Sequence, residues 1–162
     1  MSKPNKTNKT KNSVLKSLDS LEESTFEDAT DLITISFKYF CVNQKPVGQV
    51  FADWKDNMRL DLLQKFSEYT KYSRQHWKNE FSNGLPLLAE YGNFPLNSDF
   101  SIPKNIPCPD ELIWSRFRLM QKVRVCGFFV STDIAKKYTL SVNTFYVVFL
   151  DKDHRFYKTE KE

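Results

Sequence analysis

The fold is decided by two neighbouring stretches, Ile113-Trp-Ser-Arg-Phe-Arg-Leu-Met120 and Lys122-Val-Arg-Val-Cys-Gly-Phe-Phe-Val130. Apolar and polar residues alternate along the first, and β-branched and aromatic residues dominate the second, which predicts two β-strands. A core strand does not ordinarily carry cations inside this alternation, because burying an unpaired guanidinium is costly. We therefore expect Arg116, Arg118 and Arg124 to line one open face of a sheet, where an anion can bind.

The register of this hairpin follows from burial. Each strand has an apolar face and a face with arginine, and the two apolar faces meet on one side only if the loop holds an odd number of residues. We expect a three-residue loop over residues 120–122, which pairs Leu119 with Val123. This loop also places Arg118 directly opposite Arg124. Like charges in such a pair destabilise a sheet, so we expect a ligand anion or a nearby carboxylate to relieve the repulsion.

The remaining elements follow from the same periodicities. Residues 32–40 are rich in β-branched and aromatic residues and predict a strand, as does the apolar stretch 144–150. Apolar residues at helical spacing predict a helix from residue 56 or 57 to about 72 and a second helix over 73–81. The proline-rich residues 85–110 predict a long irregular connection. The predicted fold is α+β in the order β-α-α-β-β-β, an antiparallel sheet packed on two helices.

The length of 162 residues predicts one domain with a tail. Residues 1–12 are mostly Lys, Asn and Thr with little to bury, and apolar residues at helical spacing follow over 14–21. This N-terminal part is either a short helix or a solvated tail. We interpret residues 1–30 as a flexible, disordered tail and residues 31–162 as a single domain.

The composition excludes several function classes. The three cysteines form no CxxC pair, so neither a disulfide framework nor a zinc site is predicted, and we expect no metal and no cofactor. Glycine-rich phosphate loops, dinucleotide-binding motifs and the common hydrolase motifs do not occur. The start lacks the apolar region of a secretory signal, and no apolar run approaches the roughly 18 residues of a membrane span. We expect a protein of the cytoplasm that does not bind membranes.

The charge distribution favours an acidic partner. The whole chain carries a net charge of +4, whereas residues 112–162 alone carry ten Lys and Arg against five Asp and Glu. This local excess favours a polyanion docking on the C-terminal strands, and RNA is the first candidate. Beside Arg118, we expect Lys122, Arg155 and Trp114 to bind RNA, with Trp114 as a base-stacking ring. The alternative is a solvated cationic face balanced by Glu111, Asp151 or Asp153.

Two residues after the last predicted strand suit proton transfer. His154 exchanges a proton near neutral pH, and Tyr157 can donate one or orient a hydroxyl. RNA cleavage by 2′-hydroxyl attack needs a base, an acid and cations on the phosphate. We therefore expect Arg116, Arg124, His154 and Tyr157 to form the catalytic set. The alternative is a histidine in a turn and a tyrosine that packs the C-terminus.

These residues resemble a known family of proteins. The pattern consists of Trp114-Ser115-Arg116-Phe117-Arg118-Leu119, a short turn, Arg124-Val125, an apolar strand and a terminal His154-Arg155-Phe156-Tyr157. It resembles the RelE/YoeB/HigB-like toxins of bacterial toxin–antitoxin systems, whose element order is also β-α-α-β-β-β. The resemblance is specific over about 113–157 and architectural over 32–81.

The resemblance implies a function. Members of the family are small endoribonucleases that typically cut messenger RNA on the ribosome and are neutralised by a cognate antitoxin. Arg116 matches the arginine of the Trp-Ser-Arg motif, and Arg124 matches the arginine that holds the scissile phosphate. His154 and Tyr157 stand for the terminal acid–base pair, although YoeB-like members have them adjacent. The family's upstream catalytic glutamate has no clear counterpart here; Glu111 and Glu90 are weak candidates for it.

Two other functions compete with the nuclease. The same face can dock RNA or protein without catalysis, as in an accessory protein of a phage or mobile element. Alternatively, the arginines can pair with carboxylates of a partner chain in a structural subunit. A sister branch of the resembled fold poisons DNA gyrase without nuclease chemistry, so the fold alone does not decide between these functions.

Overall fold

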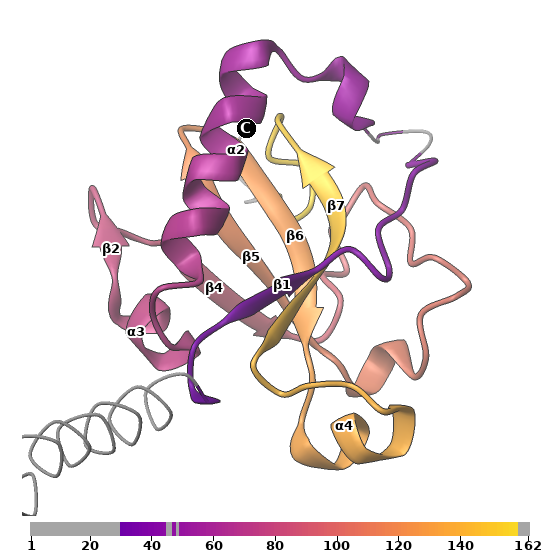
Figure 1. Ribbon diagram of the computed structural model, residues 1–162. Coiled ribbons are helices and arrows are strands. Elements are labelled where there is room, and N and C mark those ends of the chain that lie inside the picture. Colours follow the sequence, from indigo (N-terminus) through magenta and orange to yellow (C-terminus); the bar gives the residue numbers. More distant parts are fainter. Residues whose placement is uncertain (1–29, 45–46, 48, 159–162) are drawn as a thin grey trace, which may run out of the picture. The chain divides into compact units, whose positions relative to one another are not determined.

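The sheet that carries the predicted hairpin has five strands (Figure 1). From one edge to the other they are β1 (Thr34–Ser36), β7 (Thr144–Asp151), β6 (Val123–Phe129), β5 (Ile113–Met120) and β4 (Leu88–Gly92). β1 runs parallel to β7, and the other pairings are antiparallel. A separate small hairpin pairs β2 (Phe81–Ser82) with β3 (Leu85–Pro86).

The computed structural model describes residues 30–44, 47 and 49–158. The described residues from Leu32 onward belong to one compact unit. The tail predicted over residues 1–30 lies, but for its last residue, outside the described part of the chain.

Among the described residues, three α-helices accompany the sheet. They are α2 (Asp56–Tyr69), α3 (Arg74–Asn79) and α4 (Thr132–Tyr138), and residues 51–53 and 109–111 form short 3-10 helices. Ser73 caps α3, and its hydroxyl accepts a hydrogen bond from the His76 N–H. The helix ends at Asn79, and Phe81, the predicted last residue, lies in β2 instead. The first helix begins after Lys55, whose side chain makes no cap. Ser131 caps α4 in the same way that Ser73 caps α3.

The predicted fold class is confirmed at its coarser level, because the unit is α+β with a mostly antiparallel sheet. The predicted order β-α-α-β-β-β is incomplete, however. Part of the supposed irregular connection over residues 85–110 forms β3 and the edge strand β4, and the polar insert before β7 forms α4. Prolines on both sides hid the five residues of β4, and α4 is too short to show a helical period.

The β5–β6 hairpin reaches the predicted register by another route. The turn between the strands holds two residues, Gln121 and Lys122, and Met120 pairs with Val123 rather than Leu119. A β-bulge between Arg118 and Met120 then inserts the extra residue that the expected three-residue loop would have supplied. The result is the predicted pairing of Arg118 with Arg124.

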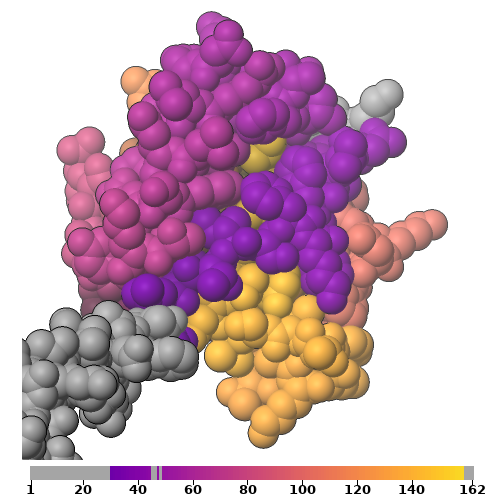
Figure 2. Space-filling model, viewed as in Figure 1, coloured from indigo at the N-terminus to yellow at the C-terminus, as the bar shows by residue number. Residues whose placement is uncertain are grey.

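Helices α2 and α3 cover one face of the sheet. In Figure 1, α2 lies across β5 and β6, and Figure 2 shows the magenta helix and the indigo segment around β1 covering this face. The Tyr69 hydroxyl at the end of α2 donates to the Arg118 carbonyl at 2.7 Å, and its ring stacks on Phe117. Trp54 and Trp77 are buried in the core on this face. Members of this core from the sheet include Phe117, Leu119, Val123, Val125, Phe129, Phe145 and Val147.

The opposite face of the sheet also carries a core. Trp114, Phe128 and Tyr146 occupy it near one end of the strands, and residues 94–112 and Phe156 cover them. This corrects the expectation of one open face. Trp114 and Phe128 lie on the same face of β5 and β6 as the arginines, and other parts of the chain cover them. Gly127 fits the crowding of the sheet here, since a Cβ at this position would lie 2.1 Å from the Tyr146 carbonyl oxygen.

Candidate functional site

The hairpin places three arginines on the sheet face that lies away from α2. Arg118 is the direct partner of Arg124 across β5 and β6, and Arg116 is the partner of Cys126 one pleat further along. Side chains two residues apart on a strand share a face, so Arg116 and Arg118 point to the same side. We refer to Arg116, Arg118 and Arg124 as the arginine cluster.

Arg124 is the most buried member of the cluster, with 5% of its surface exposed. Its Nη1 donates to the carbonyls of Gln121 and Val123 in the turn and at the start of β6. Its buried Nε has no hydrogen-bond partner. Burial and the charges of Arg116 and Arg118 lower the pKa of Arg124 to about 10, so it remains a cation at neutral pH.

The two other arginines are half-buried and are held by neutral acceptors. Arg116 donates from Nε to the Tyr91 hydroxyl at 3.1 Å and from Nη1 to the Pro86 carbonyl at 3.2 Å. Arg118 has a longer hydrogen bond, 3.4 Å, to the Ser82 carbonyl. Within the described part of the chain, no carboxylate forms an ion pair with any member of the cluster. The cluster therefore keeps its positive charge.

Tyr91 is a site residue that the sequence argument missed. It lies on β4, inside the stretch that was interpreted as an irregular connection. Its ring stacks on Tyr157 with centroids 4.8 Å apart and an interplanar angle of 13°. Burial raises the pKa of Tyr91, although Arg116 acts to lower it. The alternation of Leu88, Glu90 and Gly92 with Ala89 and Tyr91 was the signal that could have placed Tyr91 on the arginine face.

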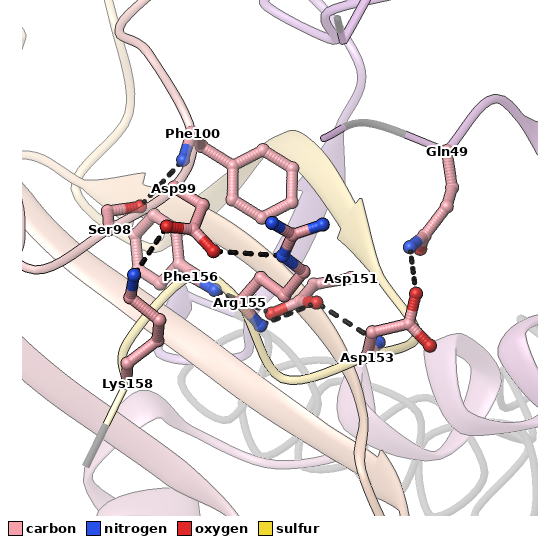
Figure 3. A network of polar contacts seen from close by, with 9 residues as sticks. All are labelled: Gln49, Ser98, Asp99, Phe100, Asp151, Asp153, Arg155, Phe156 and Lys158. Carbon is pink, nitrogen blue, oxygen red and sulfur yellow. Dashed lines mark hydrogen bonds and ion pairs between the residues drawn. The ribbon is translucent and has the colours of Figure 1, made fainter. Parts of the chain in front are cut away.

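Asp151, at the end of β7, organises the turn that carries His154. It is the strand partner of Arg124 and is fully buried. Its carboxylate accepts hydrogen bonds from the backbone N–H groups of Asp153, Arg155 and Phe156 (Figure 3). Burial raises the pKa of Asp151, while these hydrogen bonds and the nearby His154 act to lower it.

His154 and Tyr157 therefore lie on a turn that is anchored beside Arg124. The backbone of His154 has a φ of 62°, in the left-handed region that non-glycine residues seldom adopt. Gln49 further fixes the turn, because its side-chain oxygen accepts from the Lys152 N–H. Its Nε2 also donates to the Asp153 carboxylate (Figure 3). Tyr157 is exposed over 39% of its surface.

Arg155 does not join the arginine cluster and instead binds a carboxylate. Its Nε donates to the Asp99 carboxylate at 2.8 Å, and Lys158 binds the other oxygen of the same carboxylate (Figure 3). These two hydrogen bonds lower the pKa of Asp99, Lys158 having the larger effect. Asp99 thus balances the charge of Arg155, which the sequence argument assigned to RNA.

Trp114 is a core residue in the structure. It is fully buried, its indole N–H donates to the Pro109 carbonyl, and Phe94 packs edge-on against it. The expected base-stacking role is therefore corrected, because no ring face is accessible to a base. Lys122 lies exposed in the turn between β5 and β6, close in sequence to Arg124.

The two glutamates that precede the Trp-Ser-Arg motif lie elsewhere. Glu90 accepts from Arg74 at 2.6 Å and contacts Lys78 at 3.1 Å, which ties α3 to β4. Burial acts to raise the pKa of Glu90, but the hydrogen bonds from Arg74 and Lys78 outweigh it and the pKa is lowered. Glu111 is exposed in the 3-10 helix before β5.

The described residues contain no group of three or more His, Cys, Asp and Glu side chains that suits a metal ion. No helix in the same part of the chain has the length and the apolar composition that a membrane crossing requires. A comparison with protein-family models finds no match, and comparisons with curated proteins and with solved structures find no significant similarity.

Proposed function

We propose that the arginine cluster binds RNA phosphate and that the protein is a metal-independent endoribonuclease of the toxin type, acting in the cytoplasm. The observation that carries the proposal is the cluster itself: three guanidinium groups on one sheet face, with no carboxylate pairing any of them in the described part of the chain. Guanidinium groups bind phosphate oxygens with two parallel hydrogen bonds, so a phosphodiester is a matched ligand.

The reaction that suits this site is attack by the ribose 2′-hydroxyl. The 2′-oxygen forms a bond to phosphorus, and the bond from phosphorus to the 5′-oxygen breaks. One proton leaves the 2′-hydroxyl for a base, and one proton is delivered to the departing 5′-oxygen. The products are a 2′,3′-cyclic phosphate and a 5′-hydroxyl end, and no water or metal enters this step.

The residues have distinct roles in the proposal. Arg124 and Arg116 stabilise the negative charge that builds on the phosphate oxygens, and Arg118 adds to the same field. His154 and Tyr157 transfer the protons, because both lie on the turn that Asp151 anchors beside Arg124. Exposed Lys122 extends the cationic surface along the RNA backbone.

The toxin part of the proposal rests on the sequence resemblance. This resemblance implies that the substrate is messenger RNA, bound on the ribosome or free. It also implies that an antitoxin protein neutralises the enzyme. An acidic antitoxin segment that covers the arginine cluster would block RNA and relieve the repulsion between Arg118 and Arg124 at the same time.

Induction in growing cells tests the proposal. Wild-type protein should arrest growth and reduce the amount of full-length messenger RNA, and Arg124→Ala should do neither while circular dichroism shows a folded protein. Arg59→Ala is the matched control, because Arg59 lies on α2 and pairs with Asp56. Normal growth with both wild type and Arg124→Ala would count against the toxin.

A second candidate is an RNA-binding module without catalysis. The observation that favours it is the placement of Glu90, which Arg74 and Lys78 hold at the edge of the sheet, so that this carboxylate is engaged and does not serve as a base. This alternative predicts salt-dependent RNA affinity without cleavage. It also predicts that His154→Ala is harmless, whereas the nuclease should lose activity in His154→Ala and keep it in the control His76→Ala.

A further inference from the structure

Tyr91 touches two parts of the site at once. Its hydroxyl accepts the Nε–H of Arg116, and its ring stacks in parallel on Tyr157. Arg116 comes from β5, Tyr91 from the edge strand β4, and Tyr157 from the turn after β7. Tyr91 is therefore the contact through which the arginine cluster and the C-terminal turn are held in register.

The chemistry of this contact preserves the charge of Arg116. A carboxylate in the same place would neutralise the guanidinium, whereas a phenol only orients it. Burial raises the pKa of Tyr91, which keeps the phenol neutral at physiological pH. Arg116 has five N–H donors, and its two hydrogen bonds, to Tyr91 and to the Pro86 carbonyl, leave the Nη2 edge for a ligand.

The stacked pair of Tyr91 and Tyr157 also indicates which part of an RNA ligand would lie beside a bound phosphate. One face of the Tyr157 ring rests on Tyr91, and Tyr157 is 39% exposed. An exposed aromatic ring next to guanidinium groups suits an unpaired base whose own phosphate lies on the arginines. A base within a duplex is stacked and paired and is not accessible to such a ring.

We propose that Tyr91 is the positioning residue of this site, holding Arg116 and Tyr157 so that one phosphate and the adjacent unpaired base of single-stranded RNA are bound together. This inference rests on the proposed RNA function and assigns it a substrate class. Tyr91 acts through Arg116 and Tyr157.

Two variants separate the two contacts of Tyr91. Tyr91→Phe keeps the ring and removes the hydroxyl, and Tyr91→Leu removes both. The matched control is Tyr72→Phe, because Tyr72 is an exposed tyrosine that stacks on His76 near the start of α3. The probe is a short RNA methylated at its 2′-oxygens, which blocks cleavage, used as a single strand and as a duplex of the same sequence.

The expected result is graded. Wild type and Tyr72→Phe should bind the single strand more tightly than the duplex. Tyr91→Phe should bind the single strand about three- to tenfold more weakly, as expected for one lost hydrogen bond. Tyr91→Leu should in addition lose the preference for the single strand. In a nuclear magnetic resonance spectrum, the Nε–H of Arg116 should exchange faster with water in Tyr91→Phe than in Tyr72→Phe.

The outcomes distinguish a failure of the positioning role of Tyr91 from a failure of the proposed RNA function. If wild type binds RNA and the Tyr91 variants bind it equally well with the same preference, the positioning role is overturned and the RNA function stands. If wild type binds neither form, the proposed function and the inference fail together. If Tyr91→Leu does not fold, the positioning role is tested by Tyr91→Phe alone. Its RNA affinity and the exchange rate of the Arg116 Nε–H then decide whether the role stands.

Discussion

Among single residues, Arg124 stands out because its burial lowers the stability of the folded state. The guanidinium is buried and its Nε has no partner; burial, together with the charges of Arg116 and Arg118, lowers the pKa of Arg124 to about 10. A lowered pKa in the folded state means that the protonated form is destabilised there. Since both the folded and the unfolded chain are protonated at neutral pH, the whole cost is present under physiological conditions.

Arg124→Met should therefore stabilise the protein while it abolishes RNA binding. The shift in pKa sets an upper bound, and the backbone carbonyls left without a donor reduce it, so we expect a gain of about 1 kcal/mol in the free energy of unfolding. Urea titration at neutral pH measures this change. The control Arg59→Met removes a surface ion pair and should change stability by less than about 0.5 kcal/mol. A clear loss of stability in Arg124→Met would show that Arg124 is structural.

At the scale of elements, α3 and β4 are joined by the ion pair of Glu90 with Arg74. The pKa of Glu90 is lowered, so its contribution to stability is present above the ordinary value of 4.5 and is lost as the pH falls through the lower folded value. Glu90→Gln removes this dependence. Between pH 6 and pH 3 the free energy of unfolding should fall less in Glu90→Gln than in wild type. Glu111→Gln, an exposed control, should fall as wild type does.

The hairpin shows what sequence can predict about elements. Burial alone gave the pairing of Arg118 with Arg124, because one wrong step would have moved the apolar residues of β5 out of the core. Burial does not tell whether an odd loop or a β-bulge makes the adjustment, and the bulge at Leu119 does so here. The edge strand β4 was missed because strands next to prolines resemble loops, and Tyr91 was missed with it.

The same limit applies to Trp114. Period-2 alternation correctly put Trp114 on the face of Arg116, but it cannot say what covers that face. The proline-rich residues 94–112 and Phe156 fold over this end of the sheet and bury the ring. Long-range cover of this kind leaves no local signature in the sequence, whereas Trp54 and Trp77 could be assigned to the core from their places beside the helices.

At the scale of the whole molecule, the excess of positive charge lies in the C-terminal third and predicts salt-dependent binding. Each phosphate neutralised on single-stranded RNA contributes about −0.7 to the slope of log K against log salt concentration. One phosphate bound by the arginine cluster therefore predicts a slope of about −0.7. Arg118→Met should weaken RNA binding at low salt, and Arg155→Met should leave it nearly unchanged, because Asp99 already pairs with Arg155. Equal effects of the two substitutions would contradict the assignment of the cluster.

The most direct measurement is the analysis of end groups after incubating the purified protein with a defined single-stranded RNA in the presence of a chelator. The account predicts cleavage by wild type, with 2′,3′-cyclic phosphate and 5′-hydroxyl ends, and none by Arg124→Met, which should remain folded. Intact RNA with wild type, or cleavage that persists in Arg124→Met, would contradict the claim that the arginine cluster is the catalytic phosphate site of a metal-independent nuclease.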